Sequence, residues 1–562
     1  MKRLALACAA TLAALCLSEA AYRGILLLRS ALSHDPRAYT VYALGGSTTN
    51  GQPFPRRAAF PEMASAMLES SMPGRSIQVR NLARSGENIY FQWVRLRRAA
   101  AYHKGQGAVL VYAGVEPGGP HPDQGLGRAA RWGRWLERRI CARSFVLGDL
   151  LALWRGAFRR GAAFDISFYD FYLLQAVRCA QENGLTPVLS TLVSNIAEME
   201  PNFAGDEQTP PDEPKAVEGL RLEKAKLWRR AAAYYAATAA PQEPLRPWLL
   251  YRQAKCFQAL RRWDEARELH WQAVESEYKH RFNRPSRALN AAVRRTAAES
   301  GALLADSAAL FERDSPHGLP GGALFADFNH PNLRGYALLA RSFAEALGAR
   351  PQDADWREAE LRRRFSISDE DMAAAWRNSG ALLLECAGTL YPWPEDRLAM
   401  ARRAFTEALR LQPDDRRARL GLTMVSAPNW RPLLRSREAM TPFLVSLGRG
   451  RPPKPEPAAR AAAPKAPAVP DPRQTQAKLL NDRAVALGQA GRISEAAALA
   501  ARAAALDPDS GEAALTYGTL KLRLQDRGGA AAAWRRALER PSLRAGHGTR
   551  ALLKESLGKT AP

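Results

Sequence analysis

A short apolar segment that ends in two glycines and a serine constrains the fold most strongly. Residues 38–44, Ala-Tyr-Thr-Val-Tyr-Ala-Leu, are followed directly by Gly45, Gly46 and Ser47. β-Branched and aromatic residues in so short a run, ended by glycine, are typical of a buried strand in a parallel sheet. Because glycine lets the backbone turn sharply, we expect Ser47 at the carboxyl end of that strand, where open α/β sheets bind ligands.

A serine becomes a nucleophile when a base lies beside it, and the chain offers a base far downstream. Asp327 and His330 stand three residues apart, immediately before a helix that we predict over residues 332–347. This spacing lets the carboxylate fold back onto the imidazole within one turn. Ser47, His330 and Asp327 are therefore the candidate nucleophile, base and orienting acid.

These residues belong to four blocks that occur in the order of the SGNH/GDSL hydrolases, which the chain resembles. The blocks are Gly45-Gly46-Ser47-Thr48-Thr49, residues 81–88, residues 111–114 and Asp327-x-x-His330. The chain looks like the bacterial branch that combines this domain with tetratricopeptide repeats. The resemblance implies a three-layer α/β/α, flavodoxin-like domain with a parallel sheet, a Ser-His-Asp triad and no need of a metal or organic cofactor.

The resemblance also implies an oxyanion hole. Its donors would be the backbone N–H groups of Ser47 and Gly86 and an asparagine side chain in a Gly-x-Asn block. Here the chain reads Gly114-Val115-Glu116-Pro117, so either Glu116 replaces the asparagine or one residue is deleted and the asparagine is absent. Losing one such donor typically costs about a hundred- to a thousand-fold in rate. Two other asparagines are alternative donors: Asn88 and Asn195.

The remaining strands are predicted from short apolar runs bounded by turn residues. They cover residues 76–82, 107–113, 186–193 and 301–306, with a helix over residues 60–72 and helical structure within 126–184. The second and third strands end at the Gly86 loop and at Gly114. We therefore expect several strand ends to meet at one edge of the sheet and form the site.

Small residues recur at the spacing at which the two helices of a tetratricopeptide repeat touch. Between the fourth and fifth strands, Ala254, Ala266 and Ala273 have this spacing, and Trp263 is expected at the start of the second helix. Two further copies thirty-four residues apart and one weaker copy lie downstream: Ala484, Ala496, Ala503 and Pro508; Gly518, Ala530 and Ala537; Ala401, Ala408 and Pro413.

The predicted organisation has seven parts. They are a signal peptide or N-terminal membrane anchor (1–30), the first part of the hydrolase domain (35–203), a helical tetratricopeptide-like insertion (204–281), the second part of the hydrolase domain (282–350), a helical region with one degenerate repeat (351–450), a Pro/Ala-rich linker (451–475) and two tetratricopeptide repeats (476–545).

The N-terminal segment predicts export. Lys2 and Arg3 precede a fourteen-residue apolar run, and Ser18-Glu19-Ala20 offers a cleavage site. Apolar residues resume at 24–28, so an uncleaved anchor is the alternative. We expect the protein in the periplasm, or associated with the inner membrane and facing the periplasm.

Charge and residue patterns argue against two classes of partner. The net charge is +25, but the arginines are scattered among alanines, and no zinc-finger, RNA-binding or basic-zipper pattern occurs. We therefore expect no nucleic-acid partner. The six cysteines form no C-x-x-C and the eight histidines no H-E-x-x-H, so we expect no metal site.

Together these features predict an exported serine ester hydrolase with a protein partner on its repeats. By analogy with the family, its substrate would carry an acetyl or short acyl group on a cell-envelope glycan or lipid, and transfer to a sugar hydroxyl is the nearby variant. The alternative is a catalytically weakened SGNH domain that binds a glycan while the repeats act as a scaffold.

Overall fold

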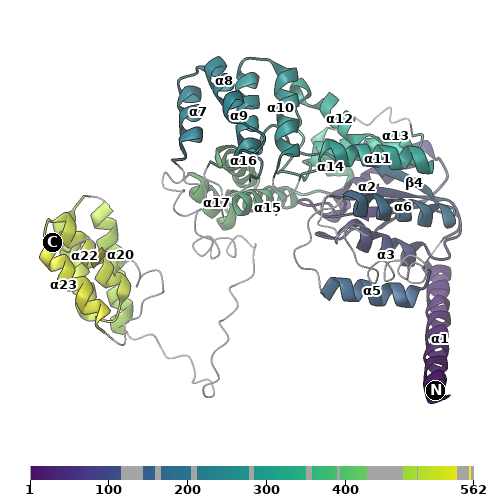
Figure 1. Cartoon of the computed structure of the whole chain (residues 1–562), viewed down its shortest axis with the longest axis horizontal. Coiled ribbons are helices and arrows are strands. Elements are labelled where there is room, and N and C mark those ends of the chain that lie inside the picture. The colour runs from purple at the N-terminus through teal and green to yellow at the C-terminus, as the bar shows by residue number, and fades with distance from the viewer. Residues whose placement is uncertain are drawn as a thin grey trace. The chain divides into compact units, whose positions relative to one another are not determined.

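The computed structural model describes residues 2–33, 35–114, 143–157, 166–203, 212–277, 284–349, 357–388, 393–426, 472–489 and 491–540, together with residues 553, 556 and 557. The chain divides into two compact units, Met1–Lys454 and Pro455–Pro562. The first unit holds one parallel sheet and most of the helices (Figure 1). The predicted linker, 451–475, lies outside the described residues except for its last four residues, 472–475, which begin the first helix of the second unit.

The sheet has five strands in the order β2-β1-β3-β4-β5, all parallel. Their bounds are β1 Tyr39–Gly45, β2 Ile77–Asn81, β3 Gly107–Tyr112, β4 Thr186–Ser190 and β5 Leu303–Ala305. All five predicted strands are confirmed, with ends that differ from the predicted ones by at most three residues. This order is that of a flavodoxin-like sheet, in which the chain changes direction between β1 and β3.

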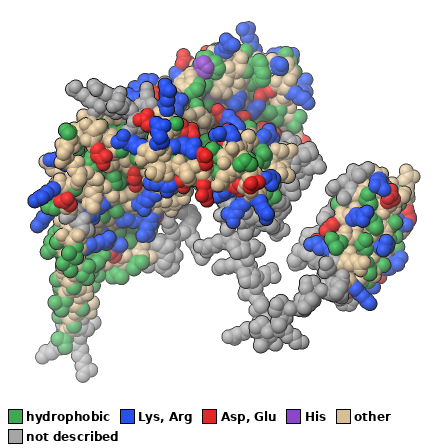
Figure 2. All heavy atoms as spheres, turned by 180° about the vertical axis from the view of Figure 1, so that it is seen from behind, with side chains coloured by type: hydrophobic (Ala, Val, Ile, Leu, Met, Phe, Trp, Pro, Cys, Tyr) green, Lys and Arg blue, Asp and Glu red, His purple; other side chains and the backbone are tan. Residues whose placement is uncertain are grey.

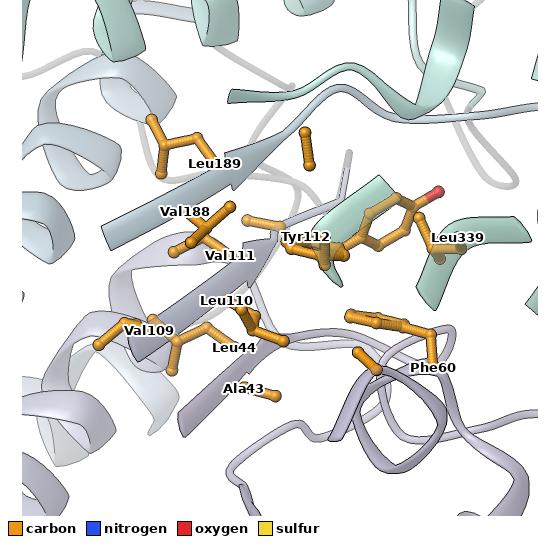
Figure 3. Close-up of a cluster of buried hydrophobic side chains, with 14 of the residues drawn as sticks. Ala43, Leu44, Phe60, Val109, Leu110, Val111, Tyr112, Val188, Leu189 and Leu339 are labelled. Carbon is orange, nitrogen blue, oxygen red and sulfur yellow. The ribbon is translucent and has the colours of Figure 1, made fainter. Parts of the chain in front are cut away.

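The core lies where the central strands meet the helices. Every residue of β1 and β3 is buried, as expected for parallel strands covered on both faces. On one face, Phe60 stacks on Phe343 with ring centroids 4.9 Å apart, and Figure 3 shows Phe60 and Leu339 beside the strand side chains. These residues lie on α2, Phe60–Ser71, and α13, Leu333–Ala346, which pack together. Both helices match predictions to within one residue at each end.

The opposite face is covered by helices that connect β2 to β3, β3 to β4 and β4 to β5. Right-handed crossovers in one direction along the sheet place such helices on one face. They are α3 Ile89–Ala100, α6 Ile166–Glu182 and α11 Arg287–Ser300. Helix α6 contacts both α3 and α11, so the domain has the predicted three layers.

Four helices are inserted between β4 and β5, each packed on the next: α7 Pro214–Lys224, α8 Trp228–Thr238, α9 Arg246–Ala259 and α10 Trp263–Glu275. Helix α10 begins at Trp263, as predicted. Ala254, Ala266 and Ala273 are all buried, which agrees with close helix contact at these small residues.

Three later helices form a second packed group: α15 Asp369–Gly388, α16 Glu395–Leu411 and α17 Arg416–Ser426. Just before α16, Trp393 lies 4.6 Å from Trp248 of α9, measured between ring centroids, and belongs to the core of the insertion. Helical segments on both sides of the second part of the sheet domain therefore share a core. The sequence did not predict this junction.

The remaining described elements of the first unit are α1 Lys2–Ser33, η1 Arg56–Ala58, α5 Phe145–Ala157, α12 Ser307–Asp314, η3 Pro316–Gly318 and α14 Glu358–Arg364. Among the described residues, one helix is long and apolar enough to cross a membrane, over Ala9–Leu32. Figure 2 shows hydrophobic side chains along this helix.

The second unit contains α20 Pro472–Gln489, α21 Ile493–Leu506, α22 Gly511–Arg523 and α23 Arg527–Leu538. Successive helices pack on one another. At the α22–α23 contact, a Cβ at Gly518 would overlap the Trp534 ring, so the small residue is required there. The two helix pairs coincide with the two predicted repeat registers.

Candidate functional site

Ser47 lies in the turn that follows β1, where the first of the two preceding glycines is sterically required. A Cβ on Gly45 would overlap the Thr49 hydroxyl and the Tyr112 carbonyl oxygen, whereas a Cβ on Gly46 would have nothing within 4 Å. The backbone thus approaches the end of β3 closely before it turns. This approach places Ser47 at the carboxyl edge of the sheet, as predicted.

Ser47, His330 and Asp327 form a continuous hydrogen-bonded chain. The Ser47 Oγ lies 2.7 Å from His330 Nε2, and His330 Nδ1 lies 2.8 Å from Asp327 Oδ2. The other carboxylate oxygen, Oδ1, accepts from the backbone N–H groups of Asn329 (3.1 Å) and His330 (2.9 Å). Asp327 is 0% exposed and His330 6%. The structure therefore brings together the three residues that the sequence singled out.

The loop that carries Asp327 and His330 is closed by its own backbone. The Ala326 N–H donates to the His330 carbonyl (2.9 Å), and the Asn332 N–H donates to the Leu324 carbonyl (2.9 Å). Asn332 also begins α13, because its side chain accepts from the Gly335 N–H at 3.0 Å. The tight turn and the helix cap together fix the imidazole relative to α13.

Side chains from two other elements hold the Ser47 turn. The Tyr336 hydroxyl of α13 lies 3.0 Å from the Thr48 carbonyl oxygen and 2.5 Å from that of Gln52, so its single proton is donated to one of them or shared between both. The Asn81 amide at the end of β2 donates to the Thr49 carbonyl (2.7 Å). The Asn81 amide also lies 3.5 Å from Glu62 Oε1. Burial raises the pKa of Glu62 to about 7, although the Asn81 hydrogen bond opposes the shift.

An open cleft lies in front of the triad. Its empty volume, including the part open to solvent, is about 450 Å³. Its described lining comes from five separate parts of the chain: Gly46, Ser47, Thr48, Tyr112, Gly114, Leu192, Val193, Pro285 and Asn329. The lining is mainly small or apolar, so the cleft suits a short acyl group.

The predicted oxyanion donors beyond Ser47 are Gly86 and the residue that replaces the family asparagine. Gly86 has φ +73° in the loop after β2, and the Arg84 N–H donates to the Gly45 carbonyl at 3.3 Å, which holds this loop beside the Ser47 turn. Gly86 is not among the described residues that line the cleft. Glu116 lies outside the described residues, so its role stays a prediction.

The two alternative asparagines have structural roles. Asn88 caps α3, since its side chain accepts from the Phe91 N–H. Asn195 is fully buried: its Oδ1 accepts from the Glu198 N–H (2.9 Å), and its Nδ2 lies 3.3 Å from the Asp327 carbonyl oxygen. Asn195 therefore supports the backbone of the triad loop, and neither asparagine is among the described residues lining the cleft.

The far side of the triad loop is covered by the second helical group. Phe328, between Asp327 and His330, belongs to a hydrophobic cluster formed mainly by α15, α16 and α17. In the same region Asn195 Nδ2 lies 3.3 Å from Met400 Sδ of α16. Helices α15 to α17, which we predicted to belong to a separate helical region, therefore support the candidate site.

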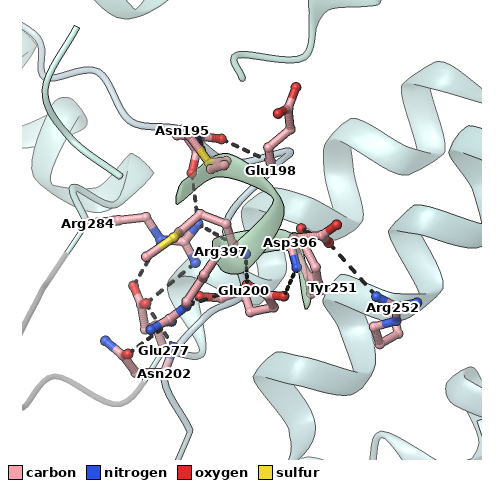
Figure 4. A network of polar contacts seen from close by, with 12 residues as sticks. Asn195, Glu198, Glu200, Asn202, Tyr251, Arg252, Glu277, Arg284, Asp396 and Arg397 are labelled. Atoms are coloured by element: carbon pink, nitrogen blue, oxygen red, sulfur yellow. Dashed lines mark hydrogen bonds and ion pairs between the residues drawn. The ribbon is translucent and has the colours of Figure 1, made fainter. Parts of the chain in front are cut away.

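One wall of the cleft is positioned by a buried ion pair. Arg284 donates to the Asn195 (2.9 Å) and Met199 (3.0 Å) carbonyls and pairs with Glu277 at 3.4 Å, and both charged side chains are almost fully buried. Figure 4 shows this network continuing toward Glu200 and α16. Because Pro285 follows Arg284 directly, the segment that leads from the helical insertion back to the sheet domain forms part of the cleft.

Sequence reasoning missed several residues around the site. Asn329 and Tyr112 each stand beside a residue that was identified, within the Asp-x-x-His block and at the end of the third strand, so they could have been proposed. Pro285 and Tyr336 gave no comparable signal, since their place depends on how distant segments pack. Among the described residues, no group of three His, Cys, Asp or Glu side chains is placed to hold a metal ion.

No protein-family model and no curated protein matches the chain. Among solved structures, the chain is similar to an acetyl-xylooligosaccharide esterase from Geobacillus stearothermophilus, at 13% identity and TM-score 0.25, over 56% of this chain and 98% of the esterase. A catalytic mutant of an acetylxylan esterase from the same organism gives 12% identity and TM-score 0.24, over 56% of this chain and 97% of that one.

A tetratricopeptide repeat protein from Parabacteroides merdae is also similar, at 14% identity and TM-score 0.16, over 62% of this chain and 98% of that protein. Because these identities and TM-scores are low, the function has to be inferred from the side chains of this chain.

Proposed function

We propose that the protein is a serine ester hydrolase of the SGNH type. The observation that carries this proposal is the hydrogen-bonded chain from Ser47 Oγ through His330 to Asp327, with bonds of 2.7 and 2.8 Å. A buried carboxylate that already accepts two backbone N–H groups is held in place to orient the imidazole. The serine faces the cleft, so an ester placed there meets its oxygen.

The chemistry follows from this arrangement. His330 Nε2 takes the Ser47 proton as Oγ attacks the ester carbonyl, and Asp327 accepts the Nδ1–H bond and stabilises the imidazolium. His330 then protonates the departing alcohol. Water, activated by the same imidazole, releases the acyl group from Ser47. The backbone N–H groups of Ser47 and Gly86 are the proposed oxyanion donors. These steps use protein groups and water alone.

For the substrate, we propose an acetyl or short acyl ester on a cell-envelope glycan or lipid. The narrow apolar lining formed by Leu192, Val193 and Pro285 suits a short acyl chain, and the open front leaves room for a larger alcohol. A sugar hydroxyl in place of water would turn hydrolysis into acyl transfer. We place the reaction in the periplasm, with the helical repeats offering a surface to a protein partner.

The direct test is hydrolysis of p-nitrophenyl acetate and butyrate by the full chain in detergent. The expected result is turnover that Ser47→Ala abolishes and that Asp327→Asn lowers by about a thousand-fold or more, because the imidazole loses its orienting carboxylate. A fluorophosphonate probe should label Ser47 and no other serine. Failure of the probe to label Ser47 in the folded protein would contradict the proposal.

The second candidate function is that of a weakened SGNH domain that binds a glycan while the repeats act as a scaffold. Glu116, at or beside the position of the family asparagine, is the observation that favours it. In that case the native chain would show no turnover, and Glu116→Asn would gain it. Measurable turnover by the native chain, at the same rate as by Glu116→Asn, would exclude this candidate.

A further inference from the structure

The N-terminal helix is joined to the sheet domain by an acidic residue in its apolar stretch. Glu19 of α1 accepts hydrogen bonds from the Ser144 hydroxyl (2.8 Å) and from the backbone N–H groups of Phe145 (3.1 Å) and Val146 (3.0 Å). These groups form the start of α5, whose first N–H groups have no partner within the helix. Glu19 therefore caps a second helix, and its charge suits the positive end of the helix dipole.

Further contacts surround this cap. The Tyr22 hydroxyl donates to Asp149 of α5 (2.6 Å), and the Arg23 guanidinium donates to the Arg143 carbonyl (2.8 Å). Asp149 also accepts from Arg98 of α3 at 2.8 Å, so α1, α5 and α3 are tied together through one carboxylate. Cleavage before Ala21 would remove Glu19 and leave the start of α5 without its cap.

The part of α1 before Glu19 has the character of a membrane anchor. Residues 2–18 span about 25 Å at about 1.5 Å per residue, somewhat less than the roughly 30 Å of a bilayer's hydrocarbon core, and they overlap the first half of the candidate span Ala9–Leu32. Three of its leucines are exposed: Leu6, Leu12 and Leu17. Lys2 and Arg3 precede its apolar run in the sequence. These basic residues favour an N-terminus on the cytoplasmic side, which places the sheet domain on the opposite side of the membrane.

Helix α5 presents a second apolar surface beside this anchor. Leu150 is 54% exposed and Leu153 71%, and their spacing of three residues puts them on the same face of the helix. Figure 1 shows α5 running across the direction of α1. A helix that crosses an anchor in this way, with apolar side chains outward, has the geometry of a helix lying in a membrane surface.

We propose that α1 is retained as a transmembrane anchor and that α5 docks on the phospholipid surface from which α1 emerges. Because α5 begins at the Glu19 cap, directly beside the anchor, the bilayer is the partner within reach of its exposed apolar face. Positive charge lies on the same side of the domain: Arg29 and Arg80 line an open hollow between α1, β2 and α3. This charge favours anionic head groups. The Glu19 cap then sets the angle between the anchor and the surface helix.

The test uses the full chain in phosphatidylcholine and phosphatidylglycerol nanodiscs that contain a phospholipid with a photoactivatable diazirine near the carbonyl end of one acyl chain. Cross-linked peptides are mapped by mass spectrometry. We expect cross-links within residues 2–18 and in α5 around Leu150 and Leu153. Cross-links confined to α1 would overturn the docking of α5.

A matched pair of variants makes this test specific. Leu150→Glu with Leu153→Glu should lower α5 cross-linking by about ten-fold or more, because charge is costly in the acyl region, and leave α1 cross-linking unchanged. The control, Val217→Glu with Leu227→Glu, alters exposed apolar side chains near α7 and should change neither signal. Equal α5 cross-linking in both variants would contradict the docking.

Retention of α1 is tested separately, by the intact mass of the protein extracted from membranes of the expressing cells. We expect the mass of a chain that keeps residues 2–30. A mass that corresponds to a chain beginning at Ala21 would overturn the anchor. Neither measurement depends on esterase turnover, so the membrane proposal and the catalytic proposal can fail independently.

Discussion

At the scale of single residues, the space around the two glycines before Ser47 decides what each position tolerates. A methyl group on Gly45 would overlap the Tyr112 backbone, which cannot move without separating β1 from β3, whereas Gly46 faces open space. Gly45→Ala should therefore destabilise the sheet domain by about 3 kcal/mol or more, and Gly46→Ala should stay within about 0.5 kcal/mol of the native chain. Thermal unfolding of the two variants checks this, and equal stability would show that β1 and β3 can separate at little cost.

Glu62 gives a pH dependence of stability near the site. Burial raises its pKa in the folded state to about 7, from an unfolded value of 4.5, so the folded state binds more protons between these two values. Its contribution to stability is therefore fully present below pH 4.5 and is lost as the pH rises through about 7, by up to about 3 kcal/mol at about 1.4 kcal/mol per pKa unit.

Glu62→Gln removes this titration and keeps the size of the side chain. We expect the variant to gain stability over the native chain at pH 8 and to show little difference at pH 4, when urea unfolding is measured for the two proteins side by side. A stability difference that does not change with pH would show that the Glu62 carboxyl has the same pKa in the folded and unfolded states.

At the scale of elements, α13 acts on both halves of the candidate site. Its start is capped beside His330, and its Tyr336 hydroxyl holds the Ser47 turn. Tyr336→Phe removes the one hydroxyl proton that the Thr48 and Gln52 carbonyls share, at the cost of about 1 to 3 kcal/mol. It should also slow fluorophosphonate labelling of Ser47 by about ten-fold or more, because misplacing a reacting group by about 1 Å can cost up to about a hundred-fold.

A matched control separates the loss of stability from the slower labelling of Ser47. Tyr42→Phe also removes a tyrosine hydroxyl bond, to the Ala99 carbonyl at 3.2 Å, but this bond joins β1 to α3 and does not touch the turn. We expect a loss of stability without a loss of labelling rate. If both variants label at the native rate, the Tyr336 hydroxyl does not position Ser47.

At the scale of the whole molecule, the proposed catalysis should need only the first unit, including the helices that follow the sheet domain. Phe328 packs among side chains of α15 to α17, while the second unit has hydrophobic clusters of its own. A chain that ends at residue 454 should therefore retain turnover to within roughly twofold, as expected for separate domains. A chain that ends at residue 356 should lose it, because the triad loop loses its support. Esterase turnover of the two truncated chains, compared with the full chain, checks this.

Local patterns were enough to predict the strands and the three residues that lie together at the candidate site. Alternation between apolar runs and glycines marks where β1 and β3 end, because a buried strand needs apolar side chains and a sharp turn needs glycine. The three-residue spacing of Asp327 and His330 brings carboxylate and imidazole together within one loop. Small residues at fixed intervals predicted the helix pairs, because close helices leave no room for larger side chains.

Only the tertiary structure decided which distant segments meet. The Ser47–His330 bond joins residues 283 positions apart, the Trp393–Trp248 contact joins two helical groups, and the Glu19 cap joins the N-terminal helix to α5. Pro285 reaches the cleft because buried Arg284 holds its neighbour in place. Such contacts depend on the packing of the complete domain, whereas spacing and periodicity describe only neighbours along the chain.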